Sequence, residues 1–342
     1  MVATKEYFGV SHDGSTVCKF TLAAPNGVRV TLGEIGAAIM EYWLPDKDGV
    51  FRDIVLGYDT VGDYEKNPAF FGAALGRCIS HPMGEMLTFN GKEYPLALND
   101  EGIHMHGGVK GFTRVHWHGE IVGDNAVRFT FFSRDGEEGY PCDLEAQIIY
   151  TLSDKGELRI AYDMRTPGLT FVNPSNHAHM NLNGHNGAGV ENHVLYVPAV
   201  GQFDIGVEEL MPLGLGSDLR EPKLLKDAFA ADDSEIRLYN GLDHMFRLEG
   251  SGWKLAARAY STDTGIELSC WTDLPAIMIM SGGSFDGSYV GKGGYPYPVH
   301  GCIAFETMIQ CSNRPLEGDI SPVIDAEHPY HSETCFVPGL RY

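Results

Sequence analysis

The chain has 342 residues, 43% of them hydrophobic, and is therefore long enough to bury a sizeable core. Its 46 Asp and Glu residues outnumber 25 Lys and Arg residues, and the resulting net charge of −21 repels nucleic-acid phosphates and anionic membrane surfaces. We therefore expect neither a nucleic-acid partner nor a membrane partner.

The composition indicates one β-rich domain. The 42 glycines, 16 tyrosines and 17 phenylalanines favour β structure, and no linker or charge block divides residues 1–342. The N-terminus lacks the basic and apolar segments of a secretory signal. The seven cysteines are an odd number without a C-x-x-C pair, which is typical of reduced thiols. We expect a cytoplasmic monomer or homodimer.

In chain order, alternating apolar and polar residues first predict a strand at 28–32, and a helix of one or two turns is predicted at 59–67. Asn90-Gly91 then separates two strand patterns and predicts a hairpin over 85–98. Residues 173–182, "NPSNHAHMNL", look like a buried strand but contain two histidines and three asparagines. A short helix is predicted near 207–211.

The later and longer strand patterns come mostly in hairpins. Strands are predicted at 126–132, 146–152, 157–164, 254–261, 266–271 and 302–311. Turn signals at 154–156 and 263–265 join two of these pairs. The pattern predicts an all-β antiparallel protein, either a large sandwich or a barrel.

Polar clusters interrupt this apolar background and carry the candidate functional residues. They are "GRCISH" with Arg77, "HMHGG" with His104 and His106, "NHAHMN" with His177 and His179, "GLDHMF" with Asp243 and His244, and "AFETM" with Glu306. Glu306 lies in a predicted buried strand, where a carboxylate is costly unless it is paired or used. A structural interpretation is also open for each cluster. The histidines can be hydrogen-bonded core residues, and the glycines after His106 can form a turn. Asp243 can be a turn or cap residue, and Glu306 can form an ion pair with Arg77.

The H-x-H spacing occurs twice, at 104–106 and 177–179, and raises a metal-site alternative. Histidines two apart on a strand share a face and can chelate zinc or iron together with a carboxylate such as Glu306. The pattern is loose, because a chain with 14 histidines forms it by chance.

Taken together and in order, these clusters resemble the aldose 1-epimerases, or galactose mutarotases. The similarity begins near Ile54 and rests on the stretches "DIVLGYDTVGDYEKNPAFFGAALGR", "FNGKEYPLALNDEGIHMHGGVKGF", "DGEEGYPCDLEAQIIYTL", "VNPSNHAHMNL", "GLDHMF", "DGSYVGKGGYPYPVHGCIAFET" and "HPYHSETCF". Linked motifs in the right order are far more specific than any single one.

The resemblance implies a single-domain β supersandwich, no metal or other cofactor, and interconversion of the α and β anomers of a free monosaccharide. It implies that Glu306 is the general base and His177 the general acid, and that His106 holds the ring-oxygen side of the sugar. Arg77 and Asp243 resemble the family's sugar-hydroxyl ligands.

The chemistry of mutarotation is compatible with these roles. The anomeric hydroxyl must lose a proton while the ring oxygen gains one, so that the ring opens, rotates about one bond and recloses. A carboxylate and an imidazole on opposite sides of the anomeric centre do this without a cofactor. Apolar neighbours are expected to raise the pKa of Glu306, and a nearby carboxylate is expected to keep His177 protonated.

Several positions depart from the family pattern and bear on the substrate. Ser80 and His81 stand where the family usually reads like "ANRI", His179 stands where an aromatic residue is common, and Met278 and Met308 stand where glutamines are common. A site built to bind a hydroxyl discriminates strongly, whereas an apolar one does not. We predict that Ser80, His81, His179 and Met278 line the substrate site. The identity of the substrate is open: it can be galactose, a deoxysugar, a pentose, a ketose or an acidic sugar.

Two other functions are open from the sequence. Asp243 and Glu306 can form the carboxylate pair of a glycoside hydrolase or lyase. A non-catalytic sugar-binding protein needs the same hydroxyl contacts without an effective acid or base.

Overall fold

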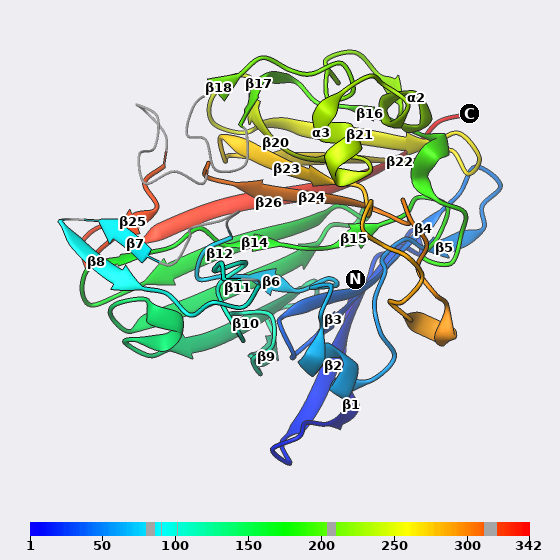
Figure 1. The fold of residues 1–342 in the computed structure, drawn as a ribbon. Helices are drawn as coiled ribbons and strands as arrows, with labels where there is room; N and C mark the ends of the chain where they lie inside the picture. The colour runs from blue at the N-terminus through cyan, green and yellow to red at the C-terminus, as the bar shows by residue number, and fades with distance from the viewer. Residues whose placement is uncertain (80–85, 90, 101, 204–209, 311–319) are drawn as a thin grey trace.

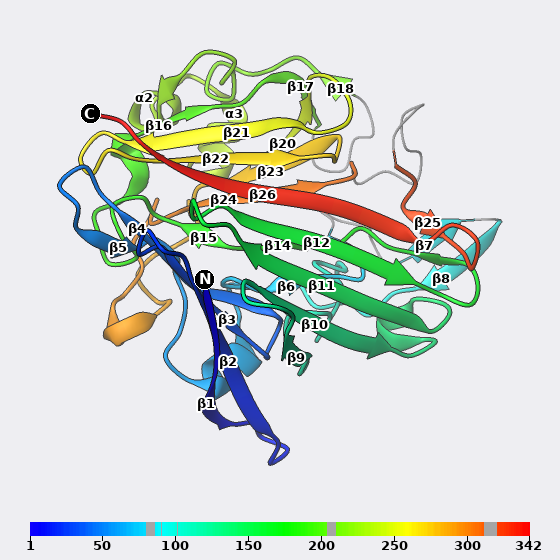
Figure 2. The ribbon, with the colours of Figure 1, turned by 180° about the vertical axis from the view of Figure 1, so that it is seen from behind.

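The computed structural model describes residues 1–79, 86–89, 91–100, 102–203, 210–310 and 320–342 (Figure 1). Strands dominate these residues, and helices are few and short. The first sheet, within the described residues, contains β1 (Val2–Val10), β2 (Thr16–Ala23), β3 (Arg29–Gly33), β4 (Ala38–Pro45) and β5 (Phe51–Asp53) in sequence order. The hairpin of β1 and β2 projects from the rest of the molecule (Figures 1 and 2).

The largest sheet, called the large sheet below, is antiparallel throughout. Its described strands, in spatial order, are β19 (Lys223–Leu224), β16 (His193–Tyr196), β21 (Lys254–Ser261), β22 (Ile266–Thr272), β26 (Tyr330–Leu340), β12 (Leu158–Arg165), β11 (Leu144–Leu152), β10 (Ala126–Ser133) and β9 (His118–Ile121). The C-terminal strand β26 lies between β22 and β12 and joins the two halves of the sheet (Figure 2).

A second antiparallel sheet, called the site sheet, packs against the large sheet. Its described strands, in spatial order, are β15 (His179–Met180), β24 (Ile303–Met308), β23 (Ala276–Met280), β20 (Asp243–Leu248), β17 (Ala199–Phe203) and β18 (Leu210–Met211). The helix predicted near 207–211 is wrong for its last two residues, which form β18; residues 207–209 lie outside the described part of the chain.

The remaining elements are short. The strand pairs are β7 (Met86–Phe89) with β8 (Lys92–Pro95), β6 (Ala74–Leu75) with β14 (Ser175–Asn176), and β13 (Thr170–Phe171) with β25 (Val323–Ile324). The helices are α1 (Val61–Lys66), α2 (Leu225–Phe229) and α3 (Ser234–Tyr239), with 3-10 turns η1 (Glu137–Gly139), η2 (Val190–Asn192) and η3 (Lys292–Gly294). No helix in the described ranges is long and apolar enough to span a bilayer.

Most predicted strands are confirmed. The pattern at 28–32 is β3, and the patterns at 126–132 and 302–311 are β10 and β24. The hairpins β7–β8, β11–β12 and β21–β22 occur as expected, and α1 begins after Thr60, whose side chain accepts a hydrogen bond from the Asp63 amide. The predicted all-β antiparallel sandwich is therefore confirmed.

The continuous strand predicted over 173–182 is wrong. Only β14 and β15 form there, and they pair with different sheets. Asparagine side chains replace the missing ladder, because the Nδ2 atoms of Asn173, Asn176 and Asn181 donate to the carbonyls of Ile309 (2.8 Å), Gly72 (2.8 Å) and Gly301 (3.0 Å). The segment is polar because its side chains satisfy backbone groups that a regular strand would pair.

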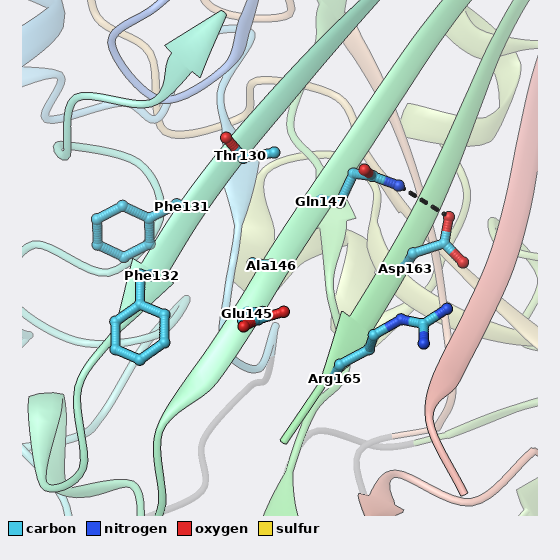
Figure 3. Close-up of a pocket in the computed structure, with 8 residues that line it drawn as sticks. All are labelled: Thr130, Phe131, Phe132, Glu145, Ala146, Gln147, Asp163 and Arg165. Atoms are coloured by element: carbon cyan, nitrogen blue, oxygen red, sulfur yellow. Dashed lines mark hydrogen bonds between the residues drawn. The ribbon is translucent and has the colours of Figure 1, made fainter. Parts of the chain in front are cut away.

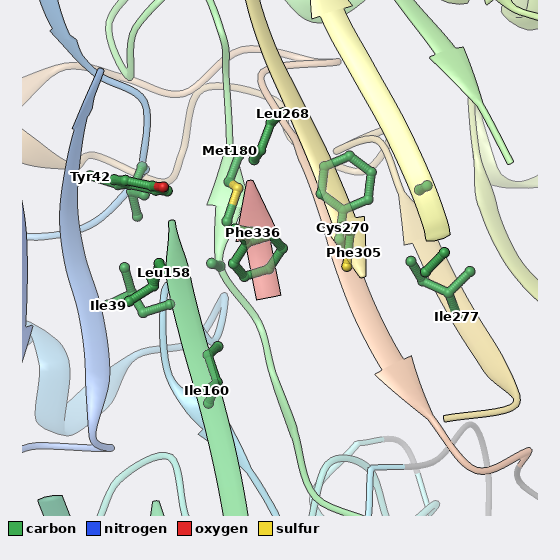
Figure 4. Close-up of a cluster of buried hydrophobic side chains, with 14 of the residues drawn as sticks. Ile39, Tyr42, Leu158, Ile160, Met180, Leu268, Cys270, Ile277, Phe305 and Phe336 are labelled. Carbon is green, nitrogen blue, oxygen red and sulfur yellow. The ribbon is translucent and has the colours of Figure 1, made fainter. Parts of the chain in front are cut away.

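The main core fills the space between the large sheet and the site sheet. Phe305 and Ile277 of the site sheet meet Leu268, Cys270 and Phe336 of the large sheet there (Figure 4). Because successive side chains of a strand point to opposite faces, burial of Phe305 on this side sends its neighbours to the other face of the site sheet.

Candidate active site

A cavity of about 480 Å³ lies over the face of the site sheet that points away from the core. Its described lining combines carboxyl, imidazole and aromatic side chains: Pro68, Ala69, Phe70, Asn99, Asp100, Met105, His106, Arg114, His177, His179, Asp243, Met280, Ser284, Phe285, Tyr289 and Glu306. The cavity thus collects the histidines, aspartate and glutamate of four clusters that are distant in sequence.

Glu306 projects into the cavity from the middle of β24. Its Oε1 lies 3.5 Å from Nε2 of His177, and its Oε2 has no hydrogen-bond partner among the described residues. Burial raises the pKa of the Glu306 carboxyl well above its usual range, and the negative charge of Asp243 raises it further. The carboxyl is therefore a stronger base than an exposed glutamate.

His177 and His106 stand beside this carboxyl. The backbone of His177 is fixed on both sides, because its N–H donates to the Ala73 carbonyl (2.9 Å) and its carbonyl accepts from Gly72 (3.0 Å). The His106 ring meets the His177 ring edge-on, with centroids 5.2 Å apart. His106 has a left-handed backbone with φ of 52°, which is strained for a non-glycine residue.

His179 lies beneath His177 and is fully buried. The two rings stack with centroids 4.4 Å apart, and Nδ1 of His179 lies 2.9 Å from the His177 carbonyl. Because a carbonyl only accepts, Nδ1 carries the proton and Nε2 has the lone pair. Burial lowers the pKa of His179 to about 3, so this imidazole is neutral at physiological pH.

Asp243 and His179 lie at opposite ends of one row of residues across the site sheet. The register pairs His179 with Ala304, Ala304 with Met280, and Met280 with Asp243, so these four residues form one cross-strand row. Three strand spacings separate the ends of the row, roughly 14 Å between Cα atoms.

Arg77 does not lie among the described lining residues of this cavity. Its Nε donates to Ser133 Oγ (2.9 Å), and its Nη atoms donate to the carbonyls of Ser133, Arg134, Pro141 and Cys142 at 2.8–3.0 Å and to Thr170 Oγ1 at 3.3 Å. All five guanidinium N–H groups are thereby used. The geometry is against the predicted sugar contact and against the ion pair with Glu306, and favours a structural role.

The predicted contacts of Met278, Ser80 and His81 have different outcomes. Met278 pairs with Glu306 across β23 and β24 but packs in an apolar cluster with Leu75 and Met245, and it is absent from the described lining. Ser80 and His81 lie outside the described residues.

Sequence reasoning missed the aromatic wall of the cavity. Phe70 stacks on His177 with centroids 6.1 Å apart, and Phe285 stacks on His179 at 5.7 Å. Tyr289 packs against Phe285. These residues lie in loops between strands, and their signal was a set of aromatic residues in otherwise polar, glycine-rich segments.

The structure also changes which histidines could form the alternative metal site. The pair at 104–106 does not chelate as a pair, because His104 uses both ring nitrogens on the Ala97 carbonyl (2.6 Å) and the Tyr140 hydroxyl (2.7 Å). One histidine of each pair instead joins Glu306: ligand atoms of His106, His177 and Glu306 all lie within 4.8 Å of one another. Asp233, Glu235 and His244 form a second such group among the described residues.

A broader hollow of about 610 Å³ lies over β10, β11 and β12 of the large sheet (Figure 3). Phe132 borders it on one side, and Gln147 donates a 3.5 Å hydrogen bond to Asp163 on the other. The polar side chains of this hollow are exposed or half-buried rather than fully buried. The cavity over the site sheet is the stronger candidate, because it contains a buried carboxyl with a raised pKa beside an imidazole.

This arrangement is suited to proton transfer on a small polar ligand. A carboxyl and an imidazole face the same cavity and are close enough to share a proton, while Asp243 and His106 offer polar contacts around them. The neighbouring aromatic rings exclude water from one side.

Comparisons with known proteins agree with this geometry. A sequence profile described as aldose 1-epimerase matches residues 19–307. Galactose mutarotase from Bos taurus is 35% identical over 314 residues, covering 89% of each chain, and aldose 1-epimerase from Escherichia coli K12 is 32% identical over 343 residues, covering 96% of this chain and 94% of the relative.

Two solved structures share the fold over nearly the whole chain. Galactose 1-epimerase from Lactobacillus acidophilus superposes with a TM-score of 0.84 at 25% identity, covering 99% of both chains. An aldose epimerase homologue from C. elegans has a TM-score of 0.85 at 24% identity, covering 94% of this chain and 98% of that chain. The matched segment 19–307 includes His106, His177, Asp243 and Glu306.

Proposed function

The chain belongs to the aldose 1-epimerase family, and from that premise we propose that Glu306 and His177 interconvert the α and β anomers of a free aldose in the cavity over the site sheet. The observation that supports this most strongly is the buried Glu306 carboxyl, 3.5 Å from the His177 imidazole and with a raised pKa. The enzyme is an isomerase.

The reaction moves protons without net consumption. Glu306 takes the proton of the anomeric hydroxyl, the bond between C1 and the ring oxygen breaks as C1 becomes a carbonyl, and His177 gives its proton to the ring oxygen. Rotation about the C1–C2 bond presents the other face of the carbonyl. Reclosure reverses both transfers and restores the starting protonation of each side chain.

The raised pKa of Glu306 serves this cycle. A carboxylate with an ordinary pKa is a weak base toward an anomeric hydroxyl, whereas burial and the charge of Asp243 raise the pKa of Glu306 well above its usual range and make it a stronger base. In the active state the proposed mechanism needs an ionised Glu306 carboxylate and a protonated His177 imidazole.

A neutral sugar fits the cavity better than an acidic one. Asp100, Asp243 and Glu306 line it against a single described Arg or Lys side chain, Arg114, whose guanidinium donates to the carbonyls of Lys66, Val109 and Asn67. His179 is a neutral imidazole and therefore offers no positive charge to an acidic group on the sugar. We assign the hydroxyl contacts to Asp243 and His106.

Three further proposals concern the domain organisation, the location and the partner of the enzyme. We propose a single domain over 1–342, because one core cluster combines residues from Phe20 to Phe336. We place it in the cytoplasm, since Cys18, Cys270 and Cys302 carry free thiols. The partner is a free monosaccharide, and the net charge of −21 disfavours nucleic acid.

Polarimetry or exchange NMR of freshly dissolved, anomerically pure sugars tests the proposal. At least one neutral aldose is expected to reach anomeric equilibrium faster with the protein than without it. Absence of acceleration with every sugar in the panel contradicts the enzyme assignment and favours a sugar-binding protein. Cleavage of an aryl glycoside, with free anomers equilibrating at their spontaneous rate, favours a glycosidase built on Asp243 and Glu306.

A further inference from the structure

The loop after His106 is held by a carboxylate from another part of the chain. Glu138 lies in η1, between β10 and β11; its Oε2 accepts from the Val109 amide (2.9 Å), and its Oε1 accepts from the amides of Lys110 (2.9 Å) and Gly111 (3.4 Å). Three successive main-chain N–H groups around one anion form a nest. Hydrogen bonds to an ionised acceptor are roughly twice as strong as neutral ones.

The two glycines that follow His106 allow this close packing. A Cβ atom on Gly108 would lie 2.3 Å from Oε2 of Glu138, and a Cβ atom on Gly107 would lie 1.7 Å from the Gly76 carbonyl oxygen. Both glycines also have positive φ angles, 94° and 104°. The "HGG" sequence is therefore required by contact with Glu138 on one side and with the Gly76 backbone on the other.

His106 is thus fixed on both sides of its strained backbone. On the N-terminal side, Asn99 accepts from the Met105 amide (2.7 Å) and donates to the Met105 carbonyl (3.0 Å). On the C-terminal side, Glu138 holds the amides of 109–111. Asn99 lines the cavity, whereas Glu138 is absent from its described lining.

We propose that Glu138 is a positioning residue for the reaction, which acts by fixing residues 107–111 and thereby the His106 ring beside His177. This inference rests on the proposed function, in which His106 contacts the sugar. The Glu138 carboxylate matches three N–H donors, so an uncharged amide at this position loses at least one bond and presents its own N–H₂ to the nest. The loop and the His106 ring then shift.

The test is a double-mutant cycle in the whole protein. Glu138→Gln is expected to lower kcat/KM by roughly 10- to 100-fold, because small misplacements of binding groups have effects of this size. In the His106→Ala background the same substitution is expected to change kcat/KM by less than about twofold, since its route of action is gone. Glu137→Gln, in the same turn but bonded to Ser133 instead, is the matched control and is expected to retain activity.

NMR of the ring signals of His106 gives a second readout that does not depend on turnover. Glu138→Gln is expected to shift or broaden these signals, while those of His193, which is buried and bonded to Asn192 and the Leu182 amide, stay in place. Equal losses of kcat/KM in both backgrounds, or unchanged ring signals with unchanged kcat/KM, overturn the proposal. If Glu138→Gln does not fold, Glu138→Asp, which keeps the charge but is shorter, enters the same cycle. A parent protein inactive on every sugar contradicts the proposed function instead, and the NMR comparison still decides the role of Glu138.

Discussion

Arg77 and Glu306 are equally buried, at about 2% exposure, but the protein surrounds them in opposite ways. Every N–H group of Arg77 meets a carbonyl or hydroxyl from the end of β10, the β10–β11 loop or Thr170. Glu306 has one oxygen without a hydrogen-bond partner among the described residues and a pKa raised by burial and by Asp243. A charge that the protein fully satisfies holds structure, whereas one left poorly satisfied in a cavity is available for chemistry.

The same contrast, between a side chain satisfied by the protein and one that faces the cavity, occurs within an H-x-H motif. His104 bonds both ring nitrogens within the protein, while His106, two residues later, lines the cavity. His179 is fixed beneath His177 as a neutral support. Residue type and spacing do not distinguish these roles, because they depend on which partners the tertiary structure brings to each ring.

The largest expected effect concerns the Arg77 side of the comparison. Arg77→Met removes the donors of a buried network and is expected to lower the free energy of unfolding by about 3–5 kcal/mol. Urea denaturation measures this loss, and Arg134→Met, at an exposed position, is expected to cost less than about 0.5 kcal/mol. Unchanged stability with a raised KM would restore the sugar contact that the sequence suggested.

On the Glu306 side, the expected effect is on turnover rather than on folding. Glu306→Gln is expected to lower kcat by roughly 100-fold or more, which is about 2.7 kcal/mol, because an amide does not accept the anomeric proton. His177→Asn is expected to act similarly, and the double variant to lose little more than either single one. Polarimetry measures turnover, and Glu145→Gln on the outer face of β11 is the control. Additive losses contradict a shared step.

The next largest expected effect is that of replacing Asp243, which is assigned to a sugar hydroxyl and also raises the pKa of Glu306. Asp243→Asn is expected to raise KM by about tenfold, the cost of a good hydrogen bond to the sugar. It also removes a negative charge that raises the pKa of Glu306. Because the ionised carboxylate is the active form, activity is lost as pH falls through this pKa, and the acid limb of kcat/KM is expected to move to lower pH. An acid limb at the same pH in Asp243→Asn and the parent protein contradicts this coupling.

The smallest expected effect is that of a chelator. Because a carboxyl and an imidazole supply both proton transfers, prolonged EDTA treatment is expected to leave kcat/KM unchanged. Metal analysis of the treated and untreated protein is the control. Stoichiometric zinc or iron that is lost together with activity would make His106, His177 and Glu306 a metal centre.

The sequence by itself determined the strand-rich fold and most of the residues that meet in the cavity. Two-residue alternation and Gly-containing turns locate β10, β11, β12, β21 and β22, because these hairpins are local in sequence. The linked polar motifs gave His106, His177, Asp243 and Glu306, which the structure brings to one cavity. A carboxylate inside a predicted buried strand singled out Glu306, and the family resemblance implied its role.

Only the tertiary structure decided which polar residues are satisfied and which face the ligand space. The sequence placed Arg77 and Met278 with the substrate, yet Arg77 bonds the β10–β11 loop and Met278 packs with Met245. It also gave no indication that Glu138 would fix the loop after His106. These roles come from contacts between residues tens of positions apart, which depend on strand pairing and loop packing. Local pattern predicts an element, but a partner from another element determines what each side chain does.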